Sequence, residues 1–283
     1  MTASEATVIP IITLTTDFGL ADQYVASIKG VILGLNPQAT IVDVSHEVKP
    51  QRLLQAVFLT QAAWPLFPPG AVHVVVVDPG VGSGRRSIVL ESPRGLFLGP
   101  DNGVLSAALP EEARPPADGG LASVAVPPGR HAFTITNTRY LREPPSATFH
   151  GRDVYAPAAA HLTLGLPPEA LGEPVEALLA FPSLRARRCR DGSLQAQVVH
   201  IDRFGNVVTD VLEEDLPEGG FVVELAGQSV AGPVRTYAEA QGLTALIGSS
   251  DYLEVALPNG SAAQALGVDI GDAVLVRPGP DVR

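Results

Sequence analysis

The segment VHVVVVDPGVGSGRR, residues 72–86, contains the strongest strand signal of the chain. Its first part, residues 72–77, is almost wholly apolar and β-branched, without alternation between apolar and polar positions. Such a run is typical of a strand covered on both faces, as in a parallel sheet between layers of helices. Pro79 cannot continue a strand ladder, so the strand is predicted to end near Asp78.

A glycine-spaced loop follows this strand directly. Glycines alternate with other residues after Asp78-Pro79, and Arg85 and Arg86 close the loop. Open α/β sheets bind ligands beyond the carboxyl ends of their strands, which is where Asp78 is expected to lie. A solvated turn with a charged rim is the alternative interpretation.

Two strand–helix pairs precede the segment. Apolar runs over 8–15 and 39–44 predict strands, and helical patterns over 22–35 and 52–64 follow them. Strand, helix, strand, helix and strand in succession form a βαβαβ unit. Because its crossovers are right-handed, the unit predicts a three-layer domain with a mostly parallel sheet.

Shorter elements are expected after it: strands over 87–90 and 95–98, a turn over 99–103, a short helix to Leu109, a surface loop over 110–120 and an alanine-rich helix within 146–165. Proline-punctuated fragments over 166–186 predict a linker. Beyond it the pattern changes to short strands with turns between them: 195–201, 207–211, 221–225, 243–247, 252–257 and 273–276. The fold class is therefore an amino-terminal three-layer α/β domain, residues 1–165, and a smaller all-β barrel or sandwich domain, residues 187–283.

Composition narrows the function classes. The net charge is −11 and no basic stripe is present, which argues against nucleic acid or an anionic membrane as a partner. Cys189 is the only cysteine, so we expect no intrachain disulfide and no cysteine metal cluster, and a cytoplasmic location. Residues 1–19 lack a basic start and a long apolar run, so no signal peptide or membrane span is expected there.

Polar residues cluster at the expected strand ends of the first domain: Asp17, Asp22, Asp78, Arg85, Asp101, Asn102, His150 and Asp153. Several carboxylates on one rim could bind a hard cation, although their spacing matches no calcium loop. Asp101 is followed by Asn102 and Asp153 is preceded by Arg152, which favours hydrogen bonding over metal binding. The glycine loop also lacks the Lys-Ser/Thr end of a Walker A loop. His150 taken alone is more often a structural histidine than a catalytic one.

Two polar turns stand out in the second domain. Residues 202–206, DRFGN, join two expected strands, and Phe204 is unusual in a turn unless it packs on something. Residues 259–261, NGS, are either an ordinary turn or the edge of a polar pocket.

Six motifs taken together resemble one family along nearly the whole chain: TTDFG, DPGVGSGRR, GPDNG, TFHGRD, DRFGN and YLEVALPNGSAA. That family is the S-adenosyl-L-methionine (SAM) hydroxide adenosyltransferases, or adenosine-forming SAM hydrolases, relatives of fluorinase and chlorinase. The resemblance implies a homotrimer in which SAM lies between one subunit's first domain and a neighbour's second. It also implies the reaction of SAM with water to give adenosine and L-methionine, without a metal or other cofactor.

The resemblance also implies roles for individual residues. Asp78, Arg85 and His150 correspond to a water-activating set, in which Arg85 stabilises hydroxide while His150 and Asp78 orient the water and accept its proton. The implied substrate contacts are Asp17 for the ribose hydroxyls, Asp22 and Asp202 for the methionine ammonium, Phe204 and Asn206 beside the adenosine, and Asn259, Ser261 and Ala262 for the adenine.

Two other functions fit the residues. The first is a metal-dependent nucleoside or phosphoester hydrolase that uses the aspartate cluster. The second is a non-catalytic sensor that binds SAM or adenosine without turnover.

Overall fold

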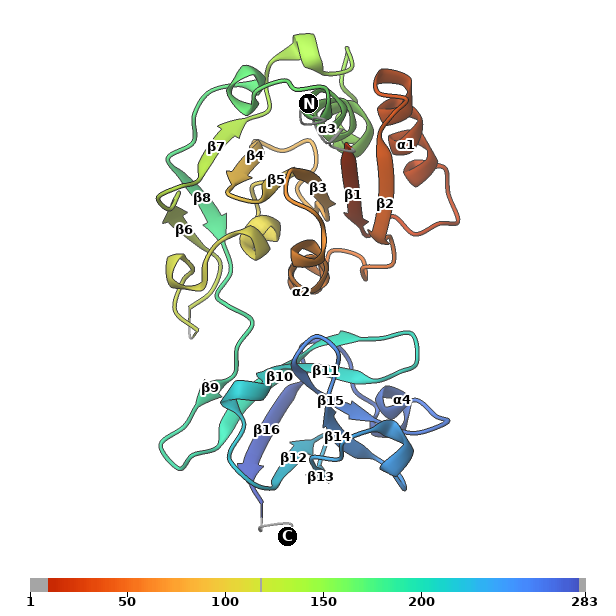
Figure 1. Ribbon diagram of the computed structural model, residues 1–283, viewed down its shortest axis with the longest axis vertical. Helices are drawn as coiled ribbons and strands as arrows, with labels where there is room; N and C mark the ends of the chain where they lie inside the picture. The colour runs from red at the N-terminus through yellow and green to blue at the C-terminus, as the bar shows by residue number, and fades with distance from the viewer. Residues whose placement is uncertain (1–9, 118, 280–283) are drawn as a thin grey trace, which may run out of the picture. The chain divides into compact units, whose positions relative to one another are not determined.

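The computed structural model describes residues 10–117 and 119–279, which form two compact units. The chain passes from the first unit to the second between Pro182 and Ser183 (Figure 1). Most of the segment expected as a linker, 166–186, thus belongs to the first unit, because β8 (Ala177–Ala180) pairs there with β6 (Ala122–Ala125). Residues 8 and 9 of the first expected strand lie outside the described residues. So do residues 1–7, part of the stretch where no signal peptide or membrane span is expected.

A six-stranded sheet forms the centre of the first unit. Its order is β2-β1-β3-β5-β4-β7. The strands are β1 (Ile11–Thr16), β2 (Thr40–Ser45), β3 (Ala71–Val76), β4 (Ser87–Ser92), β5 (Gly95–Pro100) and β7 (His131–Thr134). The first four in sheet order run parallel, and β4 runs antiparallel to both of its neighbours, β5 and β7. The predicted mostly parallel sheet is confirmed.

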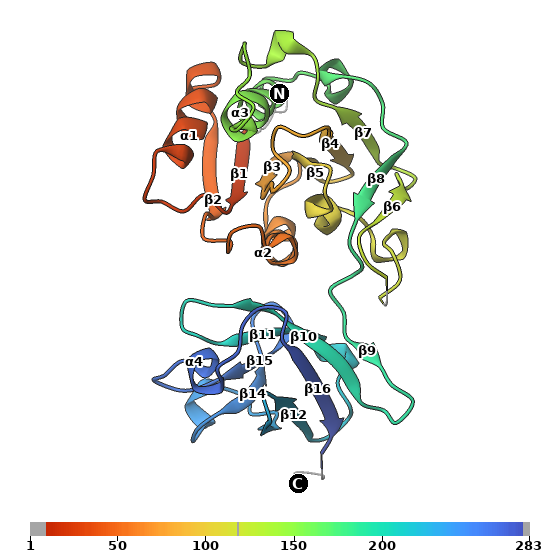
Figure 2. The same ribbon diagram turned by 180° about the vertical axis from the view of Figure 1, so that it is seen from behind.

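Helices cover both faces of this sheet (Figures 1 and 2). The helices α1 (Tyr24–Leu35) and α3 (Ala156–Thr163) share one apolar core with alternate β3 residues, including Val72 and Val74. The helix α2 (Leu53–Ala63) shares a second core with Val75 on the opposite face. All six β3 residues are buried, as their unbroken apolar run predicts. The strand β2 differs from a buried strand, because it lies at the sheet edge and has no fully buried residue.

Several turns of the first unit have tighter or wider helical geometry than an α-helix. The helix expected to end at Leu109 is a 3₁₀ helix, η2 (Val104–Ala108). Residues Gly151–Tyr155 form a π-helical turn, η5, immediately before α3. The remaining 3₁₀ turns are η1 (Trp64–Leu66), η3 (Glu111–Ala113), η4 (Thr138–Tyr140) and η6 (Pro168–Leu171).

The second unit is an almost closed antiparallel barrel. Its strands follow the path β13-β12-β16-β10-β11-β15-β14, with β9 also paired to β10. They are β9 (Arg187–Arg188), β10 (Leu194–Ile201), β11 (Val207–Leu212), β12 (Phe221–Leu225), β13 (Gln228–Gly232), β14 (Thr244–Ile247), β15 (Tyr252–Ala256) and β16 (Ala273–Pro278). The Val234 amide donates to the Ala245 carbonyl at 3.0 Å, so a backbone bond links the two ends of the path.

Helical elements of the second unit are short: η7 (Glu213–Asp215), η8 (Tyr237–Glu239) and α4 (Ala262–Leu266). The six predicted strands are present, and β9, β13 and α4 were not predicted. A two-residue turn joins β12 to β13, with Ala226 and Gly227 both at positive φ. Positive φ at both turn residues is typical of tight hairpins. Because Ala226 stands where Asn is usual before Gly, the sequence does not show the Asn-Gly pattern that predicts such a turn.

None of the described helices combines the length and the hydropathy that crossing a bilayer requires.

Candidate functional site

A cavity of about 760 Å³ lies in the first unit beyond the carboxyl ends of β1 and β3. Asp17 follows β1 directly, and Asp78 follows β3 after one more residue. His150 comes from the loop before the π-helical turn and lines the same cavity. The structure therefore brings three residues that are far apart in sequence to one edge of the parallel sheet, where ligand sites are expected.

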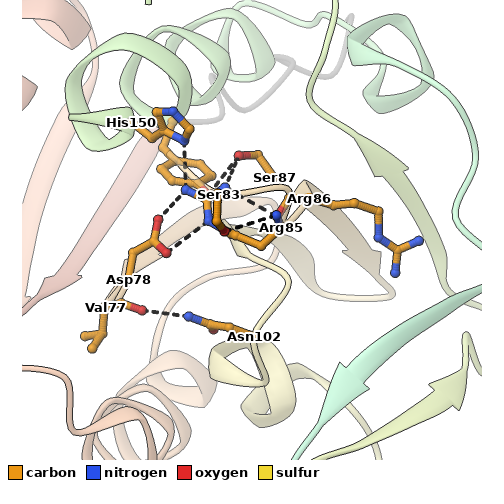
Figure 3. A network of polar contacts seen from close by, with 9 residues as sticks. Val77, Asp78, Ser83, Arg85, Arg86, Ser87, Asn102 and His150 are labelled. Carbon is orange, nitrogen blue, oxygen red and sulfur yellow. Dashed lines mark hydrogen bonds and ion pairs between the residues drawn. The ribbon is translucent and has the colours of Figure 1, made fainter. Parts of the chain in front are cut away.

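Arg85 connects the polar side chains of this site (Figure 3). Its Nε donates to Oδ1 of Asp78 at 3.0 Å, and its Nη2 donates to Oδ2 of the same carboxylate. Nη2 also lies 2.7 Å from Nδ1 of His150. The Arg85 and Asp78 side chains are only 10% and 6% exposed, so solvent screens this bidentate ion pair little.

The contact with Arg85 determines the tautomer of His150. A guanidinium can only donate hydrogen bonds, so Nδ1 of His150 must accept, and the neutral ring carries its proton on Nε2. Burial lowers the pKa of His150, and the positive charge of Arg85 lowers it further. His150 is therefore neutral at physiological pH, and its Nδ1 is not available as a proton acceptor in this arrangement.

The Asp17 carboxylate is fixed by the backbone of a neighbouring turn. Its Oδ2 accepts from the Gln51 amide at 2.9 Å, and Gln51 adopts a φ of 67°, which few non-glycine residues do. Burial raises the pKa of Asp17, and the bond from Gln51 opposes that rise. Asp17 thus lines the cavity with one carboxylate oxygen held in place by the backbone.

Three aromatic rings form one wall of the cavity. The Phe149 ring lies 5.8 Å from Phe18 and 5.1 Å from Tyr24, both nearly edge to face. The Arg152 guanidinium lies 5.1 Å from the Phe149 ring centroid. The site therefore combines a carboxylate edge with an apolar, aromatic face.

Other acids of the expected cluster support loops instead. Asp101 accepts from Arg86 Nε at 2.9 Å and from the Leu179 amide at 2.7 Å. Asp153 accepts from the Ser146 amide at 2.8 Å and from Arg152 Nε at 2.6 Å. Asp101 thus joins distant segments of the chain, Asp153 fixes its own loop, and neither carboxylate lines the cavity.

Asn102 and Asp22 also lie outside the cavity lining. Asn102 Nδ2 donates to the Val77 carbonyl at 3.0 Å, which fixes the end of the central strand. Asp22 is exposed, just before Gln23 and Tyr24, which do line the cavity. The first unit alone does not bring Asp22 into the site.

Three of the clustered aspartates, Asp78, Asp101 and Asp153, form ion pairs with arginines. Within residues 10–117 and 119–279, no group of three or more His, Cys, Asp or Glu side chains is placed to hold a metal ion.

The second unit has a pocket of its own, of about 790 Å³, lined by Asp202, Phe204, Asn206, Tyr237, Glu254 and Asn259 among others. The Asp202 carboxylate accepts from the amides of Phe204 and Asn206 and from Asn206 Nδ2, at 2.8–2.9 Å. It therefore shapes the turn that carries Phe204. The Phe204 side chain is 78% exposed and does not pack within its own unit.

The two polar turns of the second unit lie against each other. A Cβ on Gly205 would meet Ser261 Oγ at 2.1 Å, and the Ala263 amide donates to the Gly205 carbonyl at 2.9 Å. Asn259 lines the pocket, whereas Ser261 caps α4 through the Gln264 amide and Ala262 is fully buried. Ser261 and Ala262 thus position the turn without lining the pocket.

Sequence reasoning missed two residues of this pocket. Tyr237 donates its hydroxyl to Oε2 of Glu254 at 2.9 Å, and burial raises the pKa of Glu254 above its usual range. An acid in the middle of the apolar strand YLEVA is unusual, and this was the available signal. Tyr237 lies in an irregular stretch that carries no comparable signal.

Comparisons with known proteins agree with the motifs. Residues 12–172 match the family model of the SAM hydroxide adenosyltransferase N-terminal domain, and residues 196–275 match that of the C-terminal domain. A protein named (R)-S-adenosyl-L-methionine hydrolase from Thermus thermophilus is 42% identical over 90% of this chain and 95% of its own. A protein of the same name from Salinispora arenicola is 40% identical over 95% and 98%. A fluorinase from an Actinoplanes species is 29% identical over 75% and 74%.

Solved structures show the same architecture. An uncharacterised conserved protein from Thermotoga maritima superposes with a TM-score of 0.82 at 31% identity, covering 94% of this chain and all of that one. A conserved hypothetical protein from Thermus thermophilus superposes with a TM-score of 0.71 at 37% identity, covering 95% and 100%. With both domain models matched in order and full-length relatives above 30% identity, this chain belongs to the SAM hydroxide adenosyltransferase family.

Proposed function

We propose that this protein hydrolyses S-adenosyl-L-methionine to adenosine and L-methionine. Its full-length relatives are named for SAM hydrolysis, and both family domains are present. The observation that carries the proposal is the Arg85 guanidinium, which joins Asp78 and His150 on the cavity that Asp17 also lines.

The reaction needs an activated water more than it needs an acid. The water oxygen bonds to C5′ of the ribose as the C5′–S bond breaks, and the bond pair leaves on sulfur as a neutral thioether. One water proton remains on the new 5′-hydroxyl and the other is released. The catalytic problem is therefore the orientation and deprotonation of water.

Asp78 is the member of the set that accepts from this water. Each of its oxygens takes one Arg85 N–H, which leaves carboxylate lone pairs free on the cavity side. The Arg85 charge stabilises the developing hydroxide, as fixed dipoles and charges do in a site of low polarity. His150 accepts from Arg85 and orients it, in place of the proton-accepting role that the resemblance first suggested for it.

Substrate contacts follow from the two pockets. Asp17 has a free oxygen for the ribose hydroxyls, and the aromatic wall suits the apolar part of the substrate. The resemblance assigns the methionine ammonium to Asp202 and to Asp22, which adjoins the cavity-lining Gln23 and Tyr24, and the adenosine to Phe204, Asn206 and the turn around Asn259. Ser261 and Ala262 act by holding that turn.

We further propose a homotrimer in which the second unit of one subunit completes the site of a neighbour. The candidate ligands are divided between two pockets, one in each unit, and Phe204 is exposed within its own. We propose that the enzyme needs no metal or other cofactor and works in the cytoplasm.

The decisive experiment incubates purified protein separately with the (R) and (S) sulfonium epimers of SAM and chromatographs for adenosine and methionine. Both epimers are needed because the relatives' names specify the (R) form. We expect equal amounts of the two products and no effect of excess EDTA. Activity lost to EDTA and restored by a divalent ion would support the metal-dependent hydrolase instead, and tight binding without products would support a sensor.

A further inference from the structure

Two residues that the proposed reaction does not use hold Arg85 from the side away from Asp78. Arg85 Nη1 donates to Ser87 Oγ at 2.7 Å (Figure 3), and Ser87 Oγ lies 3.0 Å from the Tyr155 hydroxyl. The guanidinium also lies 6.0 Å from the Tyr155 ring centroid. Ser87 begins β4 and Tyr155 ends the π-helical turn, so the contact joins the sheet to the segment that carries His150.

All five N–H groups of Arg85 are engaged by protein atoms. Nε and one Nη2 hydrogen go to Asp78, and the other Nη2 hydrogen goes to His150. Nη1 donates to Ser87 Oγ and, at 3.4 Å, to the Arg86 carbonyl. A planar guanidinium with every donor occupied has one orientation, and Ser87 provides the shorter of the two bonds that hold Nη1.

The π-helical turn explains why His150 and Tyr155 meet the same guanidinium. The turn covers Gly151–Tyr155, and the Ala156 amide donates to the Gly151 carbonyl, the five-residue spacing of a π-helix. Wider turns bring residues five apart closer to one face than an α-helix does. His150 therefore contacts Nη2 directly, while Tyr155 reaches Nη1 through Ser87.

Packing alone does not explain why residue 155 is a tyrosine. Tyr155 is fully buried, and its ring belongs to the apolar core of the first unit, where a phenylalanine would pack as well. A buried hydroxyl is costly unless it is hydrogen-bonded, and Ser87 is the partner it has. Burial raises the pKa of Tyr155, so the hydroxyl remains a neutral hydrogen-bonding group.

We propose that Ser87 and Tyr155 are positioning residues of this enzyme, which fix the Arg85 guanidinium in the orientation that presents Asp78 and His150 to the cavity. Neither residue lines the cavity, and both act through Arg85. The kinetic part of this proposal rests on the proposed hydrolysis of SAM, and the geometric part does not.

The kinetic experiment compares Ser87→Ala, Tyr155→Phe, the double variant and Ser87→Thr in single-turnover hydrolysis and SAM binding. Losing the serine hydroxyl frees one N–H of a buried charge, so we expect Ser87→Ala to turn over about tenfold more slowly. Tyr155→Phe keeps the ring and loses only the second bond, so we expect a loss of about threefold. Since Tyr155 acts through Ser87, the double variant should match Ser87→Ala. Ser87→Thr should restore the rate, and SAM affinity should stay unchanged in all four.

The second experiment follows the His150 titration by NMR and does not require activity. The His150 signal is assigned by its absence in His150→Gln, since the chain has six histidines. The charged groups that act on His150 are Arg85, which lowers its pKa, and Asp78 and Asp153, which raise it. A released Arg85 side chain moves away from Nδ1, so we expect the pKa of His150 to rise in Ser87→Ala and less in Tyr155→Phe.

Matched controls separate positioning from general destabilisation. Ser92→Ala removes a serine at the other end of β4, whose Oγ donates to Gly95, and Tyr140→Phe removes a hydroxyl in the same unit. Neither should change the turnover rate or the His150 titration.

Each outcome decides the proposal. Unchanged single-turnover rates in folded Ser87→Ala and Tyr155→Phe overturn it, whatever the titration shows. If Ser87→Ala does not fold, Tyr155→Phe alone decides. If the wild-type protein does not hydrolyse SAM, the proposed function fails, and the titration decides the positioning role: an upward shift supports it and an unchanged pKa overturns it.

Discussion

Nδ1 of His150 lies 2.7 Å from Nη2 of Arg85, although the two residues are 65 positions apart in the chain. The same nitrogen of Arg85 also donates to Asp78. One guanidinium therefore links the end of the central strand to the loop before the π-helical turn. A change in any one of the three side chains alters the surroundings of the other two.

Alanine at Asp78, Arg85 or His150 should separate chemistry from binding. Because the three act as one unit on the attacking water, each variant should lose about two decades in single-turnover rate, and a double variant should lose little more. SAM affinity should change modestly. Arg86→Ala is the control, because Arg86 pairs with Asp101 away from the cavity and should affect melting temperature but not the rate. Unchanged rates in both His150→Ala and Arg85→Ala would refute the mechanism.

Asp17→Ala should abolish SAM binding rather than turnover alone. A carboxylate can accept from both ribose hydroxyls, and each such charge-assisted bond contributes about 1.5–3 kcal/mol. Burial raises the pKa of Asp17, so affinity should fall in mildly acidic buffer, as protonation removes the charge at a higher pH than for an ordinary aspartate. Calorimetry over a pH series tests both points, with Asp191→Asn, on the surface of the second unit, as control. Wild-type affinity in Asp17→Ala would contradict the assignment.

Mixed subunits should test the shared site. Asp78→Ala and Asp202→Ala subunits are each expected to be inactive alone, because they damage different units of the protein. If one subunit's first unit works with a neighbour's second, random co-assembly restores about a quarter of the sites. The measurement is SAM turnover of co-expressed, doubly tagged protein, with its mass from light scattering. A fully active monomer, or no recovery in verified mixed assemblies, would argue against the trimeric site.

His73 should make the first unit sensitive to acid. This side chain is 3% exposed, it bonds to Thr13 Oγ1 at 2.8 Å, and burial lowers its pKa to about 4. Between pH 6.5 and 4 the unfolded chain binds a proton that the folded chain does not. Folding stability should therefore fall by about 3 kcal/mol as pH decreases through that range.

Denaturant unfolding of wild type and His73→Gln across this pH range measures the contribution. Glutamine can keep the bond to Thr13 and does not titrate, so the variant should show a weaker loss of stability with acid. His131→Gln is the control, since His131 is largely exposed. An identical pH dependence in wild type and His73→Gln would show that His73 is not the source.

Local patterns predicted most of the framework. The unbroken run before Asp78 and the period of α1 depend only on which neighbours face the core, and both elements form as expected. The pairing of β6 with β8 was not predictable in this way. Both strands have four residues and are far apart in sequence, so the partner is set by tertiary packing.

The site residues were likewise predictable from the sequence only in part. Residue type and motif identified Asp17, Asp78 and His150, which line one cavity, and Arg85, which joins Asp78 to His150. The same criteria also selected Asp101, which has equally suitable chemistry and instead ties its turn to β8. Only three-dimensional contacts distinguish an acid that faces the cavity from one that anchors a loop.

The π-helical turn has an evolutionary consequence. It holds one residue more per turn than the α-helix that follows, and deleting a residue there would let the segment relax to ordinary α-helical geometry. Such a deletion would rotate the following side chains by about 100° about the helix axis relative to His150. Selection can therefore act here on the number of residues between His150 and Tyr155, independently of which amino acids those residues are.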